Sequence, residues 1–134
     1  MDIKVLKVGI VSCSGEALPE GTVSRVASRK VLDELRPGQT VTICLPLFIA
    51  GGKEEREFAN KFPTVTVDGC EKMCAAKSTE KLSGKPAKSL MIREILKKHD
   101  ISGLKQCKGQ GPAEKIASEV VAEEIAKAVD EALD

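Results

Sequence analysis

The sequence contains very few aromatic residues. Its 134 residues include three phenylalanines, Phe48, Phe58 and Phe62, and neither tryptophan nor tyrosine. Proteins that bind single-stranded nucleic acids stack the bases on aromatic side chains, and this chain has too few of them to form such a platform. For the same reason we expect an aliphatic hydrophobic core.

The chain also lacks a long apolar run and an excess of either charge. No stretch approaches the roughly 20 apolar residues that a membrane span needs, and Met1 to Val5 does not begin a signal peptide. Acidic and basic residues nearly cancel, leaving a formal net charge of +1, so no strong field attracts nucleic acid or an anionic membrane. We therefore expect a cytoplasmic protein that binds neither, with no protein partner identified by the sequence.

Strand-like and helix-like apolar patterns alternate through the first half of the chain. The patterns predict, in order, a strand over Ile3–Val11, a helix over Thr22–Leu35, a strand over Thr40–Leu45, a helix from about Lys53 to Lys61 and a strand over Thr64–Val67. Such alternation favours a parallel sheet with right-handed crossovers. We predict one domain over residues 1–134: an α/β three-layer sandwich with a small, mostly parallel sheet, Rossmann-like or flavodoxin-like, and helices on both faces.

The second half is less regular. Leu90-Met91-Ile92 fits a strand, but the wider apolar spacing from Ala87 to Leu96 favours a helix that begins at Pro86. That choice leaves Ile101 to Gln106 as the candidate fourth strand. A final helix follows the glycine-rich segment near Gly111, with its inward face formed by Ala117, Val121, Ile125, Ala128 and Val129.

Five cysteines are the main chemical feature of the chain. In a reducing compartment such a set indicates metal binding or redox chemistry more than disulfides, and the odd number also argues against full pairing. Cys13, Cys44 and Cys70 each follow or end a predicted strand. The carboxyl ends of parallel strands meet at one edge of a sheet, where ligands bind, so these three cysteines are expected to lie together.

The segment Asp68-Gly69-Cys70-Glu71 predicts the start of a helix, with Asp68 as N-cap and Glu71 completing a capping box. Cys70 would then lie in the first turn, and Cys74 on the same helical face about 5–6 Å away between Cβ atoms. Four thiolates from Cys13, Cys44, Cys70 and Cys74 suit a closed tetrahedral Zn²⁺ site, which leaves no metal-bound water for hydrolysis. We expect Cys107 to be a bystander, with a spare metal ligand or a redox thiol as the alternatives.

These residues also resemble a known family. Cys13-Ser14-Gly15, the helix start from Gly21 to Ala27, Cys44-Leu45, and Asp68-Gly69-Cys70 with Cys74-Ala75 are similar to the DGC family, named for its Asp-Gly-Cys motif. The resemblance covers roughly residues 5 to 80. It implies a zinc-binding protein whose four ligands correspond to Cys13, Cys44, Cys70 and Cys74, in a family without an assigned biochemical function.

Three alternatives to a zinc site remain at the level of sequence. Cys70 and Cys74 could act as nucleophile and resolving thiol in a redox or sulfur-transfer enzyme, although redox sites of the thioredoxin type use Cys-x-x-Cys spacing. A four-cysteine set also suits an iron–sulfur cluster. A cysteine-dependent phosphatase is disfavoured, because the arginine that would clamp the oxyanion is replaced by Pro19.

Overall fold

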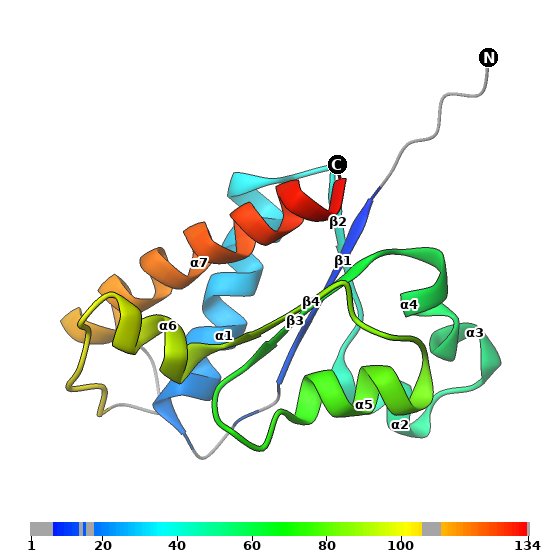
Figure 1. Cartoon of the computed structure of the whole chain (residues 1–134), viewed down its shortest axis with the longest axis horizontal. Helices are drawn as coiled ribbons and strands as arrows, with labels where there is room; N and C mark the ends of the chain where they lie inside the picture. The colour runs from blue at the N-terminus through cyan, green and yellow to red at the C-terminus, as the bar shows by residue number, and fades with distance from the viewer. Residues whose placement is uncertain (1–6, 14, 16–17, 106–110, 134) are drawn as a thin grey trace.

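The fold is built on a parallel sheet of four strands. The computed structural model describes residues 7–13, 15, 18–105 and 111–133. Within them the strands pair in the order β2-β1-β3-β4, all parallel (Figure 1). Their bounds are β1 (Val8–Ser12), β2 (Thr40–Thr42), β3 (Thr64–Asp68) and β4 (Lys88–Met91). The predicted α/β sandwich with a parallel sheet is confirmed.

Helices connect the strands and cover both faces of the sheet. They are α1 (Pro19–Lys30), which continues as the π-helical turn η1 (Val31–Leu35), then α2 (Leu45–Ala50), α3 (Lys53–Arg56), α4 (Phe58–Lys61), α5 (Cys74–Leu82), α6 (Ile92–Lys98) and α7 (Pro112–Leu133). Helices α1, α6 and α7 lie on one side of the strands, and α2 to α5 lie on the other (Figure 1).

The two faces of the sheet have different cores. The core under α1, α6 and α7 is aliphatic, with Val8 and Ile10 of β1 facing the buried side of α7. The core under α2, α4 and α5 contains Phe48 and Phe58, with Phe62 packed against it. The rings of Phe48 and Phe58 meet edge to face at a centroid distance of 6.1 Å. The expectation of an aliphatic core is therefore correct for one face and wrong for the other.

The main error of the sequence prediction lies at β4. Residues Lys88–Met91 form an edge strand, and the following helix begins only at Ile92. Without this strand, the buried strand β3 would have unpaired backbone groups along one side, which is costly. Residues 101–105 are not a strand, which leaves no described part of the Ile101–Gln106 prediction in the sheet.

Smaller differences concern where elements begin and end. Strand β1 is shorter than predicted, although residues 3–6 lie outside the described residues. Strand β2 ends at Thr42, and the unpredicted helix α2 begins just after Cys44, where a proline in the first turn favours a helix start. The helix expected over Lys53–Lys61 is two short helices, α3 and α4.

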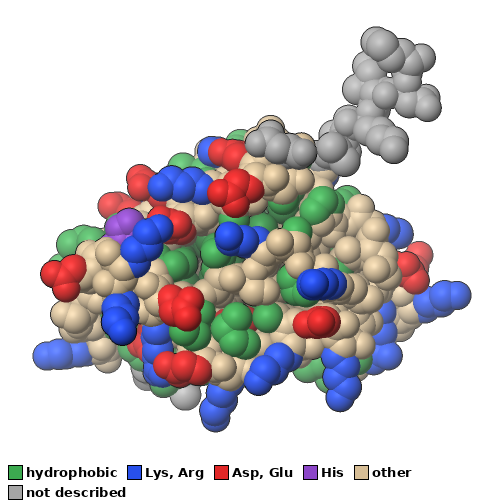
Figure 2. All heavy atoms as spheres, viewed as in Figure 1, with side chains coloured by type: hydrophobic (Ala, Val, Ile, Leu, Met, Phe, Trp, Pro, Cys, Tyr) green, Lys and Arg blue, Asp and Glu red, His purple; other side chains and the backbone are tan. Residues whose placement is uncertain are grey.

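The surface carries both charges in a mixed pattern. Figure 2 shows acidic and basic side chains interspersed over the visible face. None of the described helices has the length and apolarity that a membrane span requires.

Candidate thiol site at the carboxyl edge of the sheet

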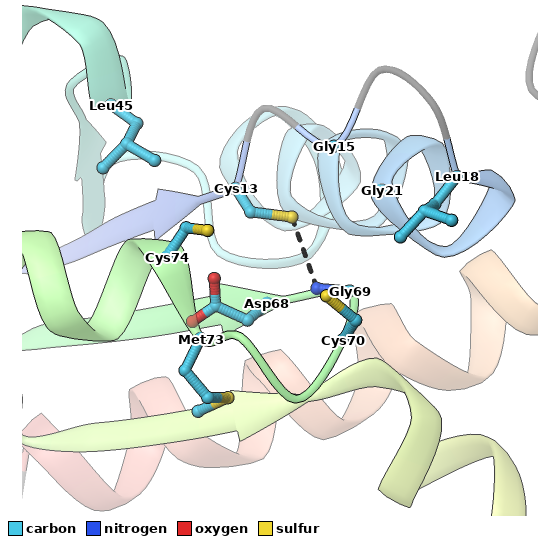
Figure 3. Close-up of a pocket in the computed structure, with 10 residues that line it drawn as sticks. All are labelled: Cys13, Gly15, Leu18, Gly21, Leu45, Asp68, Gly69, Cys70, Met73 and Cys74. Atoms are coloured by element: carbon cyan, nitrogen blue, oxygen red, sulfur yellow. Dashed lines mark hydrogen bonds between the residues drawn. The ribbon is translucent and has the colours of Figure 1, made fainter.

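Three of the predicted site cysteines line one pocket at the carboxyl ends of β1 and β3. The pocket has a volume of about 250 Å³. Figure 3 shows Cys13, Cys70 and Cys74 at this pocket, with the carboxylate of Asp68 pointing toward the start of α5 and away from Cys70. The complete lining is Cys13, Gly15, Leu18, Gly21, Leu45, Asp68, Gly69, Cys70, Met73 and Cys74.

Cys13 forms the buried end of the pocket. It follows β1 directly, and its backbone N–H continues the sheet by donating to the carbonyl of Val67 at 2.9 Å. Its side chain is only 7% exposed. The sulfur accepts the backbone N–H of Gly69 at 3.3 Å and lies 3.4 Å from the hydroxyl of Ser24. These contacts fix the sulfur between the end of β1 and the loop that follows β3.

Three glycines allow the backbone to close around Cys13. A Cβ atom on Gly21 would meet the carbonyl oxygen of Gly15 and lie 2.5 Å from its Cα. A Cβ atom on Gly69 would lie 3.0 Å from the backbone nitrogen of Gly21. Gly15 itself has a φ of +22°, which glycine tolerates best. The start of α1 therefore packs directly against the loops that carry Cys13 and Cys70.

Asp68 is a buried carboxylate that caps helix α5. It is 1% exposed, and its two oxygens accept the backbone N–H groups of Ala75 at 2.7 Å and Ala76 at 3.0 Å. Burial raises the pKa of Asp68 above its usual value, and the two N–H donors and the nearby charge of Lys77 oppose that rise. Asp68 thus ties the end of β3 to the first turn of α5.

The predicted capping box at Asp68-Gly69-Cys70-Glu71 is wrong in its details. Asp68 does cap a helix, but that helix begins at Cys74, so Cys70 lies in the preceding turn. Met73 ends this turn in the left-handed conformation, with a φ of 52°. Glu71 does not reach back to Asp68 and instead pairs with Arg93 at 2.7 Å. The sequence signal was correct for the cap and placed the helix start too early.

Cys70 and Cys74 form the rim of the pocket. Cys70 is half-buried in the turn, and Cys74 is the exposed first residue of α5. Both side chains enter the pocket from the same connection between β3 and α5 (Figure 3). They come together through this turn rather than through adjacent positions on one helical face.

Cys44 lies apart from the other three. It is exposed at the start of α2 and lines a separate depression between β2 and α1, together with Arg25 and Arg29. Cys107 falls outside the described residues. Among the residues that the structure describes, no three His, Cys, Asp or Glu side chains are already arranged to hold a metal ion.

Comparison with known proteins gives a family. The family model of the DGC domain matches residues 9–132. The chain belongs to the DGC domain family. No curated protein and no solved structure matches the chain. The DGC match runs well beyond residue 80, where the resemblance in sequence motifs ended, and includes β4, α6 and α7.

The DGC motif has a distinct structural role at each of its three positions. Asp68 caps α5, Gly69 packs its backbone against the start of α1 and donates to Cys13, and Cys70 turns into the pocket. Sequence reasoning missed Leu18, Leu45 and Met73, the apolar residues that complete the lining. Leu45 belongs to the Cys44-Leu45 pair that resembles the family, whereas no sequence signal distinguishes Leu18 and Met73 from the other apolar residues of the chain.

Proposed function

We propose that this DGC protein binds a thiophilic metal ion, with zinc as the expected metal, in the pocket at the carboxyl edge of the sheet. The observation that supports the proposal best is the meeting of Cys13, Cys70 and Cys74 in one pocket, although Cys13 is far from the other two in sequence. Thiolates are the preferred ligands of Zn²⁺.

The donor chemistry suits the metal, and binding would require the cysteines at the rim to reorient toward Cys13. Cys13 is held in place by Gly69 and Ser24. Cys70 and Cys74 lie at the rim, where Cys70 is half-buried and Cys74 is exposed. When bound, zinc would cross-link the end of β1 to the turn before α5, in a structural, metal-handling or sensing role.

Metal analysis of the purified protein tests this function. The protein is prepared with a reductant and without chelator, its metal content is measured, and the metal-free form is titrated with Zn²⁺ against a competing indicator. We expect bound zinc in the wild type. We expect Cys70→Ser to weaken binding by more than about tenfold, because even residues behind metal ligands change affinity by 10–100-fold. A wild type without metal and without affinity for Zn²⁺ would exclude the proposal, and a brown protein with visible absorbance would indicate an iron–sulfur cluster instead.

A second candidate function is thiol chemistry by Cys70 and Cys74. Their position on a single turn at the pocket rim, accessible from solvent, favours it. A peroxide would oxidise the two thiols to a disulfide and be reduced to water, with the two thiol hydrogens passing to its oxygens. Peptide mapping of the peroxide-treated, metal-free protein tests this function, because it requires a Cys70–Cys74 disulfide that forms before any other and that dithiothreitol reverses.

A further inference from the structure

We infer that the proposed metal ion is bound by three thiolates and one carboxylate, those of Cys13, Cys70, Cys74 and Asp68, and that Cys44 is not a ligand. The assignment rests on the proposed function, because it names the donors of the same site. It differs from the four-cysteine set that the sequence predicts.

Two of these donors are fixed before any metal binds. Cys13 and Asp68 are 7% and 1% exposed, and backbone N–H groups orient both of them. A carboxylate has about four lone-pair sites, and Ala75 and Ala76 occupy one on each oxygen. Asp68 therefore retains acceptor capacity, and it lines the pocket together with the three cysteines.

The other two donors lie on a short segment that can close over the fixed pair. Cys70 and Cys74 flank the turn that ends at Met73. They are the more exposed cysteines of the pocket. Reorientation of two rim side chains on one turn completes the donor set without moving the sheet.

Cys44 is absent from the lining of the pocket. Its neighbour Leu45 lines the pocket, whereas Cys44 lines the separate depression beside Arg25 and Arg29. Leu45 and Phe48 anchor α2 in the core on this face of the sheet. Cys44 therefore lies outside the pocket, at the start of a helix that is anchored in the core.

The charge of the site does not require a fourth thiolate. A carboxylate carries the same single negative charge, so zinc with three thiolates and one carboxylate has the same total charge as zinc with four thiolates. The N–H groups of Gly69, Ala75 and Ala76 already point at the buried donors and offset part of that charge.

Counting the sulfur donors tests the assignment. The reduced, metal-free protein is loaded with ¹¹³Cd²⁺ for NMR and with Co²⁺ for absorption spectroscopy, because the cadmium shift and the sulfur-to-cobalt absorbance both grow with the number of thiolates. The same measurements are made on Cys13→Ser, Cys70→Ser, Cys74→Ser, Cys44→Ser and Cys107→Ser. We expect a three-sulfur signature in the wild type. Cys44→Ser and Cys107→Ser should reproduce it, and each of the other three should lose one thiolate's share of the absorbance.

Other results would overturn the assignment in separable ways. A four-sulfur signature that loses one sulfur in Cys44→Ser or Cys107→Ser would assign that cysteine in place of Asp68 and leave the proposed metal binding intact. A wild type that binds neither ion would remove both the assignment and the proposed function.

Discussion

Gly21 decides how closely helix α1 approaches the loop that follows β1. Its missing side chain lets the backbones of Gly21 and Gly15 touch, and the Cys13 sulfur lies within 3.3 Å of where a Cβ atom on Gly15 would be. Neighbouring backbone atoms cannot move aside as a flexible side chain can. The shape of the pocket around Cys13 therefore depends on a position with no side chain.

Gly21→Ala should destabilise the protein. Glycine to alanine within a helix normally stabilises by about 0.5–1 kcal/mol, but here the methyl group meets the Gly15 backbone, and overpacking costs about 1–3 kcal/mol. We expect a lower free energy of unfolding in urea denaturation. Gly52→Ala is the matched control, because its Cβ atom meets only the end of the Glu55 side chain at 3.5 Å, and it should change stability by less than about 0.5 kcal/mol. Equal stability of wild type and Gly21→Ala would contradict this packing.

Thr79→Val should stabilise the protein. Thr79 is 0% exposed in α5, and its hydroxyl has no hydrogen-bond partner among the described residues. A buried hydroxyl without a partner costs about 1–3 kcal/mol, and valine has nearly the same shape. We expect a higher midpoint in thermal and urea unfolding. Thr66→Val is the control, because the equally buried Thr66 hydroxyl donates to Ser89 at 3.0 Å, and its loss should cost about 0.5–1.5 kcal/mol. A stability gain in both variants would show that burial alone sets the effect.

Helices α6 and α7 are joined by a small ionic cluster at Glu124. This partly buried carboxylate lies 3.1 Å from His99 Nε2 and within 4.0 Å of Lys98 and Lys127. The hydrogen bond from His99, followed by the charges of the two lysines, lowers the pKa of Glu124, although burial opposes this. The lowered pKa means that ionised Glu124 stabilises the fold.

The contribution of Glu124 should disappear in acid. Because the folded pKa lies below the unfolded one, the stabilisation is fully present above the unfolded value and is lost as the pH falls through the folded value. Glu124→Gln should therefore be less stable than wild type at pH 7, by about 0.5–1 kcal/mol. The difference should shrink in unfolding experiments run at successively lower pH below 4.5, the ordinary pKa of a glutamate side chain. The exposed Glu123→Gln on the same helix should show no such trend, and a gap that widens in acid would contradict the assignment.

The elements predicted correctly are those whose local pattern and tertiary context agree. Strand β3 and helix α7 have apolar spacing that suits one structure only, and both were predicted within one residue or a few. Residues 88–91 have an apolar run too short to distinguish strand from helix, and the free edge of β3 decided the outcome. Local spacing contains no information about which strand lacks a neighbour.

The same limit applies to the candidate site. Strand ends predicted that Cys13 and Cys70 would lie at one edge, because chain direction alone determines that placement in a parallel sheet. Cys44 also lies beyond the carboxyl end of its strand, but β2 ends at Thr42 and α2 begins almost at once, and Cys44 lines the depression beside α1 rather than the pocket. A shift of three residues in the end of a strand is enough to change which surface depression a side chain lines.

Over the whole molecule, the candidate site lies against only one of the two hydrophobic cores. Cys13, Leu45 and Ala75 belong to the smaller core with the phenylalanines, whereas α7 closes the larger aliphatic core on the other face. Metal binding should therefore stabilise the face with α2 and α5 more than the face with α7. This difference between the faces distinguishes binding at the pocket from binding elsewhere on the surface.

Zinc should raise the stability of the reduced protein and protect one region selectively. A ligand that binds only the folded state at a free concentration of 100 times its Kd adds about 2.7 kcal/mol, and we expect a matching rise in the thermal midpoint. Hydrogen exchange should slow most from Gly69 to Ala76, where the turn closes and α5 begins, and little in α7. Cys44→Ser should respond as the wild type does, whereas Cys70→Ser should lose both effects. Protection spread evenly over both faces, or a midpoint that zinc leaves unchanged, would place the metal outside this pocket.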